Sequence, residues 1–412
     1  MGQPVALRCI TCGAEYAPAA LDYTCPTCGP RRGTLEVLYD LNELRRHLDR
    51  SSFAASGRLS LWRYLPLLPV ADDRWIQPLR VGWTPTYAFD DLARELGLSR
   101  LFVKDDGQNP TASYKDRASS LVVIKAQESG RSVVTCASTG NAASSLAGFV
   151  AATDLEASIF VPKRAPEAKV AQLLVYGARV FVVDGSYDVA YDLAAEAAEA
   201  FGWYNRSAAI NPYLVEGKKT GAFELAEQLD WNPPDDIFVS VGDGSVISGL
   251  CKGFAELETL RLIDHAPRVI GVQAQGASPI AAAFDRFDGS TVDIEDVEAE
   301  TIADSICVGS PRDIVKAVRY VHANGGRFVA VSDEEILSAI VELARRTGVF
   351  AEPAGAAPFA GLRKIAEAGT LNGRAAAIVV SGSGLKDTAS VRRAVGEPIH
   401  VAPSLKEIER YL

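Results

Sequence analysis

Lys115 is the residue of this chain whose surroundings most strongly suggest chemistry. It stands in the stretch Asn-Pro-Thr-Ala-Ser-Tyr-Lys-Asp-Arg, residues 109–117, between an expected buried strand at 101–104 and an expected helix rich in Ala, Val and Leu. A lysine at such a junction can reach into a cleft. Its amine becomes a nucleophile or a base when burial or a neighbouring cation lowers its pKa, or when it forms a Schiff base. The alternative is a solvated lysine on the first turn of a helix.

Two further loops follow expected buried strands and can supply backbone donors to an anion. Residues 137–145 are Ala-Ser-Thr-Gly-Asn-Ala-Ala-Ser-Ser, and residues 241–249 are Val-Gly-Asp-Gly-Ser-Val-Ile-Ser-Gly. Glycines permit tight turns, and the N–H groups at a helix start favour a phosphate or a carboxylate. The first loop could also be an ordinary helix cap. The second differs from the dinucleotide fingerprint and lacks the Lys-Ser/Thr of a P-loop, which disfavours a nucleotide site.

Two details bear on how a ligand would bind, one in the loop at 241–249 and one in a third loop at 379–387. Asp243 is unfavourable beside a dianion, so we expect its carboxylate to point away and only its N–H to serve. Residues 379–387, Val-Val-Ser-Gly-Ser-Gly-Leu-Lys-Asp, close the last expected strand. The hydroxyl of Ser381 can hydrogen-bond a heteroaromatic nitrogen without requiring that nitrogen to carry a proton. Taken alone, this segment could be any turn at the end of a strand.

Four of the seven cysteines form two Cys-x-x-Cys pairs, Cys9 with Cys12 and Cys25 with Cys28. A glycine follows the second cysteine of each pair. This spacing is typical of a structural zinc ribbon with four thiolate ligands. A disulfide pair or a redox dithiol is the alternative, which a reducing cytosol disfavours.

Composition limits the classes of function. The chain has 412 residues, 48% of them hydrophobic, and a formal net charge of -10, which together suit a protein with a sizeable core. The acidic balance argues against a nucleic-acid partner, and no apolar run is long enough to cross a membrane. The start of the chain has no apolar signal region, so we expect a cytoplasmic protein.

Short strands and amphipathic helices alternate along most of the chain, which predicts an α/β fold with parallel sheets. A helix is expected at 40–49, and an acidic surface segment at 285–300. Helical spacing of apolar residues is also evident at 191–201 and 333–347. Besides the strand at 101–104, the expected strands are Val133–Cys136, Ala157–Val161, Ala178–Val183, Asp235–Val241, Arg268–Gln273 and Ala376–Val380.

Together these segments resemble the fold-type II pyridoxal-phosphate (PLP) enzymes and, within them, the threonine synthase family. Residues 109–117 look like the family's Asn-Pro-Thr-Gly-Ser-Phe-Lys-Asp-Arg, and residues 137–144 look like its Ala-Ser-Thr-Gly-Asn-Thr-Ala-Ala. The resemblance covers nearly the whole chain. The other matching segments are 169–172, 210–212, 216–220 and 350–354.

The resemblance implies a tryptophan synthase β-like architecture with two open, parallel-rich sheets. A zinc ribbon would occupy residues 1–38, and a small domain residues 131–208. The large domain would combine residues 39–130 with 209–412. The implied cofactors are PLP and a structural Zn²⁺, and the implied assembly is a homodimer.

The resemblance also implies roles for individual residues. Lys115 would be the Schiff-base lysine and the catalytic base. Asn141 would bind the cofactor's 3′-oxygen, and Ser381 its pyridine nitrogen. Ser138 and Thr139 would bind the substrate carboxylate, and Lys169, Ser113 and Arg117 the substrate phosphate. The cofactor phosphate would rest on the loop formed by Gly242, Asp243, Gly244, Ser245, Val246 and Ile247.

The implied reaction is that of a carbon–oxygen lyase acting on a phosphorylated amino acid, O-phosphohomoserine, with water, to give L-threonine and phosphate. A sister enzyme of β-replacement or β-elimination is the alternative, similar to cysteate synthase, an ammonia-lyase or a serine/threonine dehydratase. A non-catalytic protein that binds the cofactor is a third possibility, which the intact Lys115 segment disfavours.

Three segments depart from the family pattern on the substrate side. The family's last motif, Thr-Gly-His-Gly-Leu-Lys-Asp, has its histidine replaced by Ser383, and its threonine by Ser381. Cys307 stands where an arginine is usual, and the family's Gly-Glu-Gly-x-Thr-Pro motif becomes Val81-Gly82-Trp83-Thr84-Pro85, without its acid. Loss of a cation and a histidine bears on how a phosphate dianion would be bound, because a hydrogen bond to a charged group is worth about 1.5–3 kcal/mol.

Overall fold

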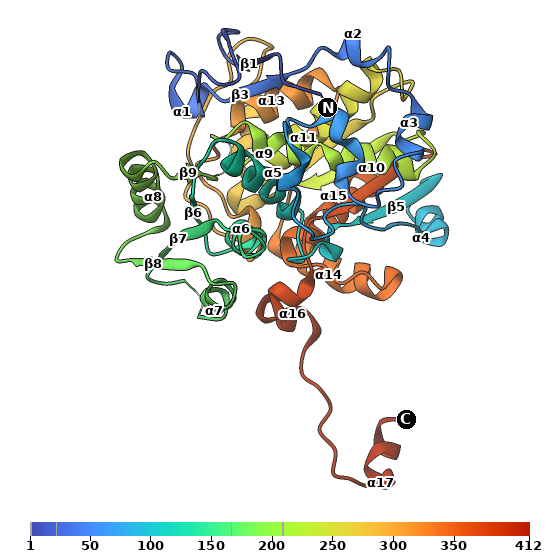
Figure 1. The fold of residues 1–412 in the computed structure, drawn as a ribbon. Helices are drawn as coiled ribbons and strands as arrows, with labels where there is room; N and C mark the ends of the chain where they lie inside the picture. The colour runs from blue at the N-terminus through green and yellow to red at the C-terminus, as the bar shows by residue number, and fades with distance from the viewer. Residues whose placement is uncertain (1, 22, 166, 208–209) are drawn as a thin grey trace.

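The computed structural model describes the chain except for residues 1, 22, 166, 208 and 209 (Figure 1). It contains three sheets, of six, four and three strands. In the six-stranded sheet the order is β12-β11-β10-β13-β5-β4, and all neighbours are parallel except the edge pair β4 and β5. Its strands are β4 (Thr86–Ala88), β5 (Arg100–Asp105), β10 (Asp236–Ser240), β11 (Arg268–Ala274), β12 (Arg327–Val331) and β13 (Ala375–Val380).

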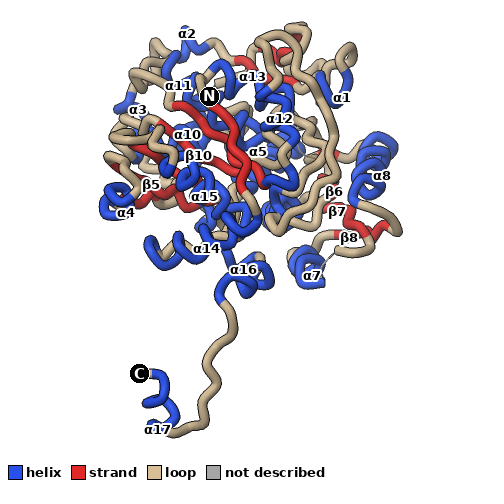
Figure 2. The backbone as a smooth tube through the Cα atoms, turned by 180° about the vertical axis from the view of Figure 1, so that it is seen from behind, coloured by secondary structure: helices blue, strands red, loops and turns tan. Residues whose placement is uncertain are grey.

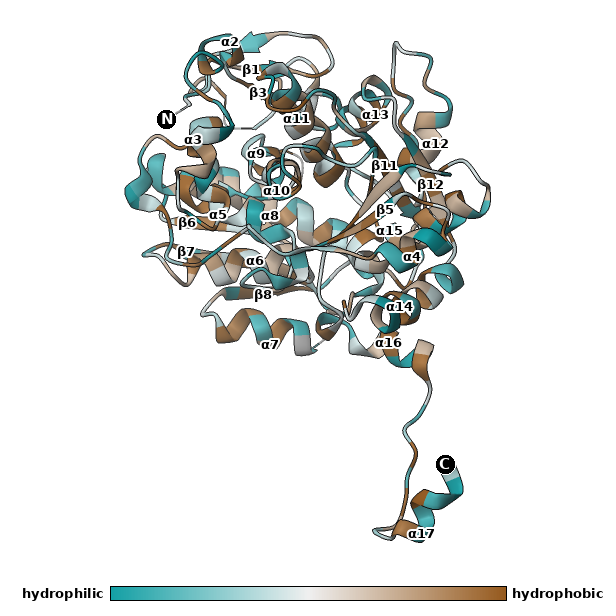
Figure 3. Ribbon diagram, turned by 90° about the vertical axis from the view of Figure 1, so that its right-hand side faces the viewer, coloured by the Kyte–Doolittle hydropathy of each residue, from teal (hydrophilic) through white to brown (hydrophobic). Residues whose placement is uncertain are grey.

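Helices cover both faces of this large sheet because its central strands are apolar on both faces. Along β10, Ile237 and Val239 belong to one core cluster, and Phe238 between them belongs to another. Figure 3 shows the hydrophobic colouring of strand β11 inside the molecule. One cluster holds residues of α10 (Thr220–Gln228), α11 (Ser245–Thr259), α12 (Pro279–Asp285) and α13 (Ile314–Ala323). The other holds residues of α4 (Asp90–Glu95), α14 (Asp333–Thr347), α15 (Pro353–Glu367) and α16 (Thr388–Val395).

The four-stranded sheet, in the order β8-β7-β6-β9, is parallel throughout and lies to one side of the large sheet (Figures 1 and 2). Ala190 and Ala194 of one helix pack against Phe160, and such small side chains let that helix approach the sheet closely. The strands are β6 (Val133–Ala137), β7 (Glu156–Pro162), β8 (Arg179–Val183) and β9 (Tyr204–Asn205). The associated helices are α5 (Lys115–Glu128), α6 (Asn141–Val150), α7 (Glu167–Val175), α8 (Tyr187–Phe201) and α9 (Tyr213–Lys218).

The N-terminal segment forms the three-stranded antiparallel sheet of β1 (Ala6–Cys9), β2 (Glu15–Tyr16) and β3 (Leu35–Leu38), with the short helix α1 (Gly29–Arg32). It lies on α11 and α13, where Lys316 donates to the carbonyl of Leu35 at 3.0 Å. The acidic segment at 285–300 passes beside it, and Arg31 pairs with Asp296 at 2.5 Å. This segment therefore contacts the ribbon as well as solvent.

The helix expected at 40–49 is wrong. Helix α2 spans only Leu41–Leu44, and α3 (Arg50–Ala54) starts anew. The reason is Asp49, whose side chain accepts from the Ser52 N–H and forms a capping box, which begins a helix rather than continuing one. Strands β4, β9 and β12 and the ribbon strands were not expected from the sequence because they are short or lie at sheet edges.

The remaining regular elements are short. Within the described residues, no helix is both long and apolar enough to span a membrane. After α16 the chain extends away from the body and ends near α17 (Leu405–Ile408) (Figure 1). The 3₁₀ helices are η1 (Leu61–Leu67), η2 (Asp73–Trp75), η3 (Asp106–Gln108), η4 (Gln275–Ala277), η5 (Asp304–Ile306), η6 (Gly384–Lys386) and η7 (Glu409–Tyr411).

Candidate active site

Lys115 is the first residue of α5, and a tight turn presents it near the carboxyl edge of the large sheet. The turn contains Ala112, whose φ of 62° lies in the left-handed region. The Tyr114 N–H donates to the carbonyl of Ser381 at 2.9 Å, which ties the turn to the end of β13. Burial lowers the pKa of Lys115, and this favours the neutral amine that a nucleophile or base needs.

The glycine-rich loop of residues 242–247 joins the end of β10 to the first turn of α11. Gly244 has a φ of 97°, and a Cβ at Gly242 would lie 3.0 Å from the Cα of Ile306, so both positions favour glycine. The Asp243 carboxylate accepts from a backbone N–H beyond the loop, that of Arg312, at 2.7 Å. The first N–H groups of a helix have no partner within it, so this loop can bind an anion.

Ser381 stands at the end of β13, next to the end of β10. Its side chain is buried, and its hydroxyl lies 3.2 Å from that of Ser240. Either hydroxyl of this pair can donate to an acceptor on a ligand between the two strand ends. Lys115, the loop at 242–247 and Ser381 therefore meet where three parallel strands end, the usual place for a ligand in such sheets. We refer to these residues as the inner wall.

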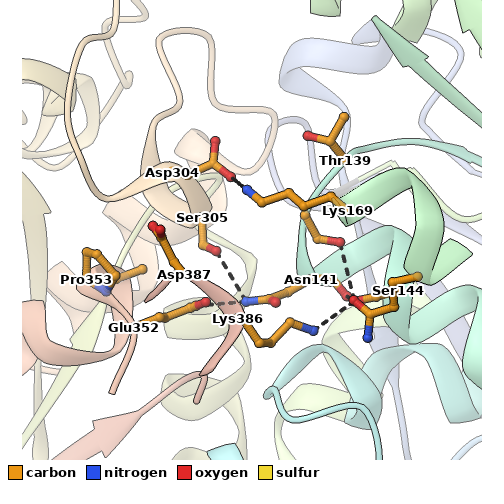
Figure 4. Close-up of a pocket in the computed structure, with 13 residues that line it drawn as sticks. Thr139, Asn141, Ser144, Lys169, Asp304, Ser305, Glu352, Pro353, Lys386 and Asp387 are labelled. Atoms are coloured by element: carbon orange, nitrogen blue, oxygen red, sulfur yellow. Dashed lines mark hydrogen bonds and ion pairs between the residues drawn. The ribbon is translucent and has the colours of Figure 1, made fainter. Parts of the chain in front are cut away.

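A pocket opens beside the inner wall, between the two larger sheets (Figure 4). Asn141 bridges it, donating to Glu352 at 2.8 Å and to Ser305 at 3.2 Å. Lys169 of α7 forms an ion pair with Asp304 across the opening. We refer to the lining of this pocket as the outer wall, which comprises Thr139, Gly140, Asn141, Ser144, Lys169, Gln172, Asp304, Ser305, Glu352, Pro353, Ala354, Lys386 and Asp387.

The outer wall carries both signs of charge. Burial raises the pKa of Glu352, and the Lys115 and Lys386 ammonium groups oppose that rise. Burial also lowers the pKa of Lys386, which donates to the Ser144 hydroxyl at 2.9 Å. The charged side chains of the outer wall already have polar partners. A substrate that binds there must therefore replace these contacts with its own.

The residues predicted to bind substrate do not all reach this pocket. Thr139 and Lys169 line it. Ser138 lies one residue before that lining, where its hydroxyl accepts from the Gly140 N–H at 3.1 Å. Ser113 is buried, and its hydroxyl has no hydrogen-bond partner among the described residues.

Arg117 is not among the residues that line the pocket. Its guanidinium is buried behind α5, with Asp106 at 2.6 Å on one side and Glu224 at 2.6 Å on the other. These two carboxylates hold the pKa of Arg117 well above its ordinary value despite the opposing effect of burial. A guanidinium occupied in this way stabilises the fold, so the prediction that Arg117 binds a substrate phosphate has no support in its surroundings.

Several residues of the site had no role assigned from the sequence. Glu352 and Lys386 lay in recognised segments, but their types alone did not show what they face. Asp304 lies close to the departure at Cys307, and an acid beside Lys169 was not foreseen. Lys218 and Arg206 are buried cations near Lys115, and no local pattern distinguishes them from surface residues.

The four cysteines of the two pairs converge as expected. Their sulfur atoms all lie within 4.8 Å of one another, and those of Cys12 and Cys25 are 3.8 Å apart. Sulfurs at the corners of a zinc tetrahedron with Zn–S bonds of about 2.3 Å are separated by about 3.8 Å. The Gly13 N–H donates to the Cys9 carbonyl at 3.0 Å, and the equivalent bond at Gly29 is 2.9 Å. The cluster can hold a metal ion.

The inner wall fits PLP on several independent observations. It offers a lysine with a lowered pKa for the aldehyde and a helix start for the phosphate. It also offers a strand-end hydroxyl for the ring nitrogen. The glycines at 242 and 244 leave the backbone approachable where a Cβ would crowd neighbouring segments.

Comparison with known proteins agrees with this fit. The family model of pyridoxal-phosphate dependent enzymes matches residues 78–382. The threonine synthase of Methanocaldococcus jannaschii is 39% identical over 407 residues, which cover 98% of each chain. That of Methanosarcina acetivorans is 38% identical over 98% of this chain and 97% of its own.

Among solved structures, the processed form of threonine deaminase isoform 2 from Solanum lycopersicum matches with a TM-score of 0.66 and 20% identity, covering 93% of this chain and 98% of that one. Diaminopropionate ammonia lyase from Escherichia coli matches with a TM-score of 0.67 and 18% identity, covering 84% and 92%. These likenesses show the fold alone. Fold and site thus define a fold-type II PLP-dependent enzyme. Within that class, the chain belongs to the threonine synthase family.

The three departures from the family pattern lie outside the pocket lining. Ser383 follows Gly382 at the end of β13, and its N–H donates to the Ala112 carbonyl at 3.1 Å. Cys307 follows η5 and donates to the carbonyl of Ala299 at 3.6 Å. In the motif before Thr84 and Pro85, Val81 is buried in a hydrophobic cluster, and the ring of Trp83 stacks on the Arg63 guanidinium at 4.2 Å.

Proposed function

We propose that this protein converts O-phosphohomoserine and water into L-threonine and phosphate. The observation that supports this most is the similarity to two curated threonine synthases over 98% of this chain, at 38–39% identity. The lysine, the anion-binding loop and the strand-end serine of the inner wall are the parts that the chemistry needs. We further propose a cytoplasmic homodimer acting on a small amino-acid substrate.

PLP, when bound, withdraws electrons from the substrate's α-carbon, so that protons on neighbouring carbons become removable. The chain's own residues would then position the substrate and move these protons. Lys115 would hold the cofactor and would be freed when the substrate binds. Its freed amine, kept neutral by burial, removes the α-proton and carries protons between the α-, β- and γ-carbons as phosphate leaves and water adds.

The proposed contacts follow the two walls. The N–H groups of the loop at 242–247 would hold the cofactor phosphate, and Ser381 would bind the ring nitrogen. Asn141 is proposed to bind the 3′-oxygen, which requires it to exchange its present contact with Glu352. Ser138 and Thr139 are proposed for the substrate carboxylate, and Lys169 for its phosphate. Ser113, whose hydroxyl has no partner among the described residues, is proposed for the same phosphate.

A second candidate function has one observation in its favour. The outer wall sets Asp304 against Lys169, and Glu352 and Asp387 add further acidic groups, so the pocket is not dominated by cations. Such a pocket suits an amino acid whose leaving group is uncharged. An eliminating enzyme acting on threonine or serine is therefore the alternative.

A product assay separates the two functions. The purified protein is incubated with PLP and, in parallel, with O-phosphohomoserine, phosphoserine, threonine or diaminopropionate. Threonine synthase activity releases phosphate and threonine in equal amounts from O-phosphohomoserine alone. Release of ammonia and a keto acid from threonine, without phosphate release from O-phosphohomoserine, would establish the alternative instead.

A further inference from the structure

A second lysine lies beside the glycine-rich loop. Lys218 is the last residue of α9 and is 2% exposed. Its ammonium donates to the hydroxyl of Ser245, the first residue of α11, at 2.5 Å. The side chain of Lys218 therefore ends at the part of the loop where an anion would rest.

The surrounding backbone holds Lys218 firmly in this place. A Cβ at Gly217 would lie 2.0 Å from the carbonyl oxygen of Arg117, and one at Gly249 would lie 2.8 Å from the Lys218 Cβ. These two glycines let α9 pack closely against both α5 and α11. The Tyr114 hydroxyl donates to the Lys218 carbonyl at 2.7 Å, which links it to the residue preceding Lys115.

Unlike the buried lysines Lys219 and Lys104, Lys218 has no carboxylate partner. Lys219 pairs with Glu216 at 2.6 Å, and Lys104 pairs with Glu224 at 2.9 Å. Across the chain apart from the five undescribed positions, no ion pair within 4.0 Å involves Lys218. A buried ammonium without a counter-charge is costly, so Lys218 keeps its proton at little cost only when an anion is bound beside it.

The nearest charged groups increase the free-energy cost of burying the Lys218 ammonium. After burial, the ammonium of Lys115 and the guanidinium of Arg206 are the groups that most lower the pKa of Lys218. Arg206 is itself 2% exposed, and its guanidinium donates to the Ser119 hydroxyl. The opposing carboxylates have other partners, since Asp243 is held by the Arg312 amide and Asp313 by Lys316 at 3.3 Å. Three basic groups therefore share a region that suits a dianion.

We propose that Lys218 is a cofactor-binding residue whose ammonium, positioned by Ser245, neutralises the phosphate of PLP on the loop at 242–247. This rests on the proposed site of the cofactor phosphate, and not on the identity of the amino-acid substrate. It adds a side-chain cation to a phosphate site otherwise formed by backbone N–H groups. The same ammonium is unfavourable when the phosphate is absent.

Substitution of Lys218 by methionine tests the proposal, because methionine keeps the length of the side chain and removes the charge. Cofactor-free Lys218→Met protein is titrated with PLP, with pyridoxal, which lacks the phosphate, and with inorganic phosphate. We expect affinity for PLP and phosphate to fall on the order of 10- to 100-fold, as for the loss of a hydrogen bond to a charged group. Affinity for pyridoxal should stay unchanged.

Stability of the cofactor-free protein gives a second readout. Because a buried basic group without a counter-charge is removed, the thermal midpoint of Lys218→Met without ligand should equal or exceed that of the wild type. Lys104→Met is the matched control, since it removes a buried lysine that has a carboxylate partner. The control should lower the midpoint and leave the ratio of PLP to pyridoxal affinity unaltered.

The outcomes are distinct. Wild-type PLP affinity in Lys218→Met, an equal loss for pyridoxal and PLP, or a less stable or unfolded cofactor-free variant would each overturn the proposal. Failure of the wild-type protein to form any PLP adduct at Lys115 would instead overturn the proposed function.

Discussion

The inner and outer walls of the site handle charge in opposite ways. Around the inner wall, the basic groups of Lys115, Lys218 and Arg206 have no carboxylate partners within ion-pair distance among the described residues. In the outer wall, Lys169 is paired with Asp304. The first arrangement is complete only with an anion that stays bound. The second can exchange partners, as binding and release of a substrate in each turnover require.

The comparison also explains why burial alone does not identify a ligand-binding cation. Arg117 is as deeply buried as any residue of the inner wall, but two carboxylates neutralise it. Lys218 has one hydroxyl instead. The partner, rather than the burial, separates a structural cation from one that is available to a ligand.

The largest effect is expected from Lys115→Ala. The variant should form no borohydride-stable PLP adduct, and its turnover should fall by about 10³-fold or more, because the loss removes both the cofactor attachment and a base worth about 10²–10⁴-fold. Mass analysis of the reduced protein and a phosphate-release assay measure the two effects. Lys169→Ala is the control and should keep the adduct, so an adduct in both variants would contradict the assignment.

Glu224→Gln should destabilise the protein by about 3–5 kcal/mol, because it leaves charges of Arg117 and Lys104 buried with less compensation. Although burial opposes it, the Arg117 and Lys104 charges lower the pKa of Glu224 from 4.5 to about 2. The stability contributed by Glu224 is therefore present above pH 4.5 and lost as pH falls toward 2. Urea unfolding across this range should show the wild type and the variant converging at low pH.

A change in KM with unaltered stability would contradict this structural role. It would show that the Arg117 cluster affects substrate binding, and Arg117 would then be assigned to the active site rather than to the stability of the fold.

Glu352→Gln should change the pH dependence of cofactor capture. The Glu352 carboxylate raises the pKa of Lys115, in opposition to burial, so its removal should lower that pKa further. More neutral amine is then present at a given pH, and the pH midpoint for PLP attachment to cofactor-free protein should move down. Stopped-flow absorbance measures it. Asp304→Asn serves as control and should leave the midpoint in place, while an upward move in Glu352→Gln would refute the coupling.

Asp304→Asn should itself produce a modest effect on the outer wall. Without its partner, Lys169 is free to bind a phosphorylated substrate, and KM for O-phosphohomoserine should fall by at most about 5-fold, since partly exposed ion pairs contribute about 0.2–1 kcal/mol. Steady-state kinetics with kcat measured separately checks this. A higher KM would mean that Asp304 orders the pocket rather than competing with substrate.

The smallest effect is expected from Ala112→Gly, in the turn before Lys115. Glycine removes the left-handed strain at a φ of 62° but adds backbone freedom to the unfolded chain. The free energy of unfolding should therefore rise by about 0.5–1 kcal/mol. Thermal unfolding measures the gain, and Ala118→Gly within α5 should instead be destabilising. A loss of stability in Ala112→Gly would show that the turn is not strained.

Local patterns were enough to predict much of this protein. The spacing of Cys9, Cys12, Cys25 and Cys28, the glycines at 242 and 244, and the place of Lys115 at a strand-to-helix junction are features of short segments. Each depends on backbone conformation or on ligand spacing within a few residues, and both can be inferred from the local sequence. The strands of both larger sheets were predictable for the same reason, except where they are short or lie at an edge.

Contacts between distant segments decided the rest. Arg117 and Lys218 are each a cation next to a well-defined motif, and nothing in either neighbourhood shows that the first meets Glu224 and the second Ser245. Asn141 likewise meets Glu352, 211 residues away. Secondary structure follows from local preferences, but the neutralisation of a buried charge depends on which helices and strands pack together, and only the tertiary structure determines that.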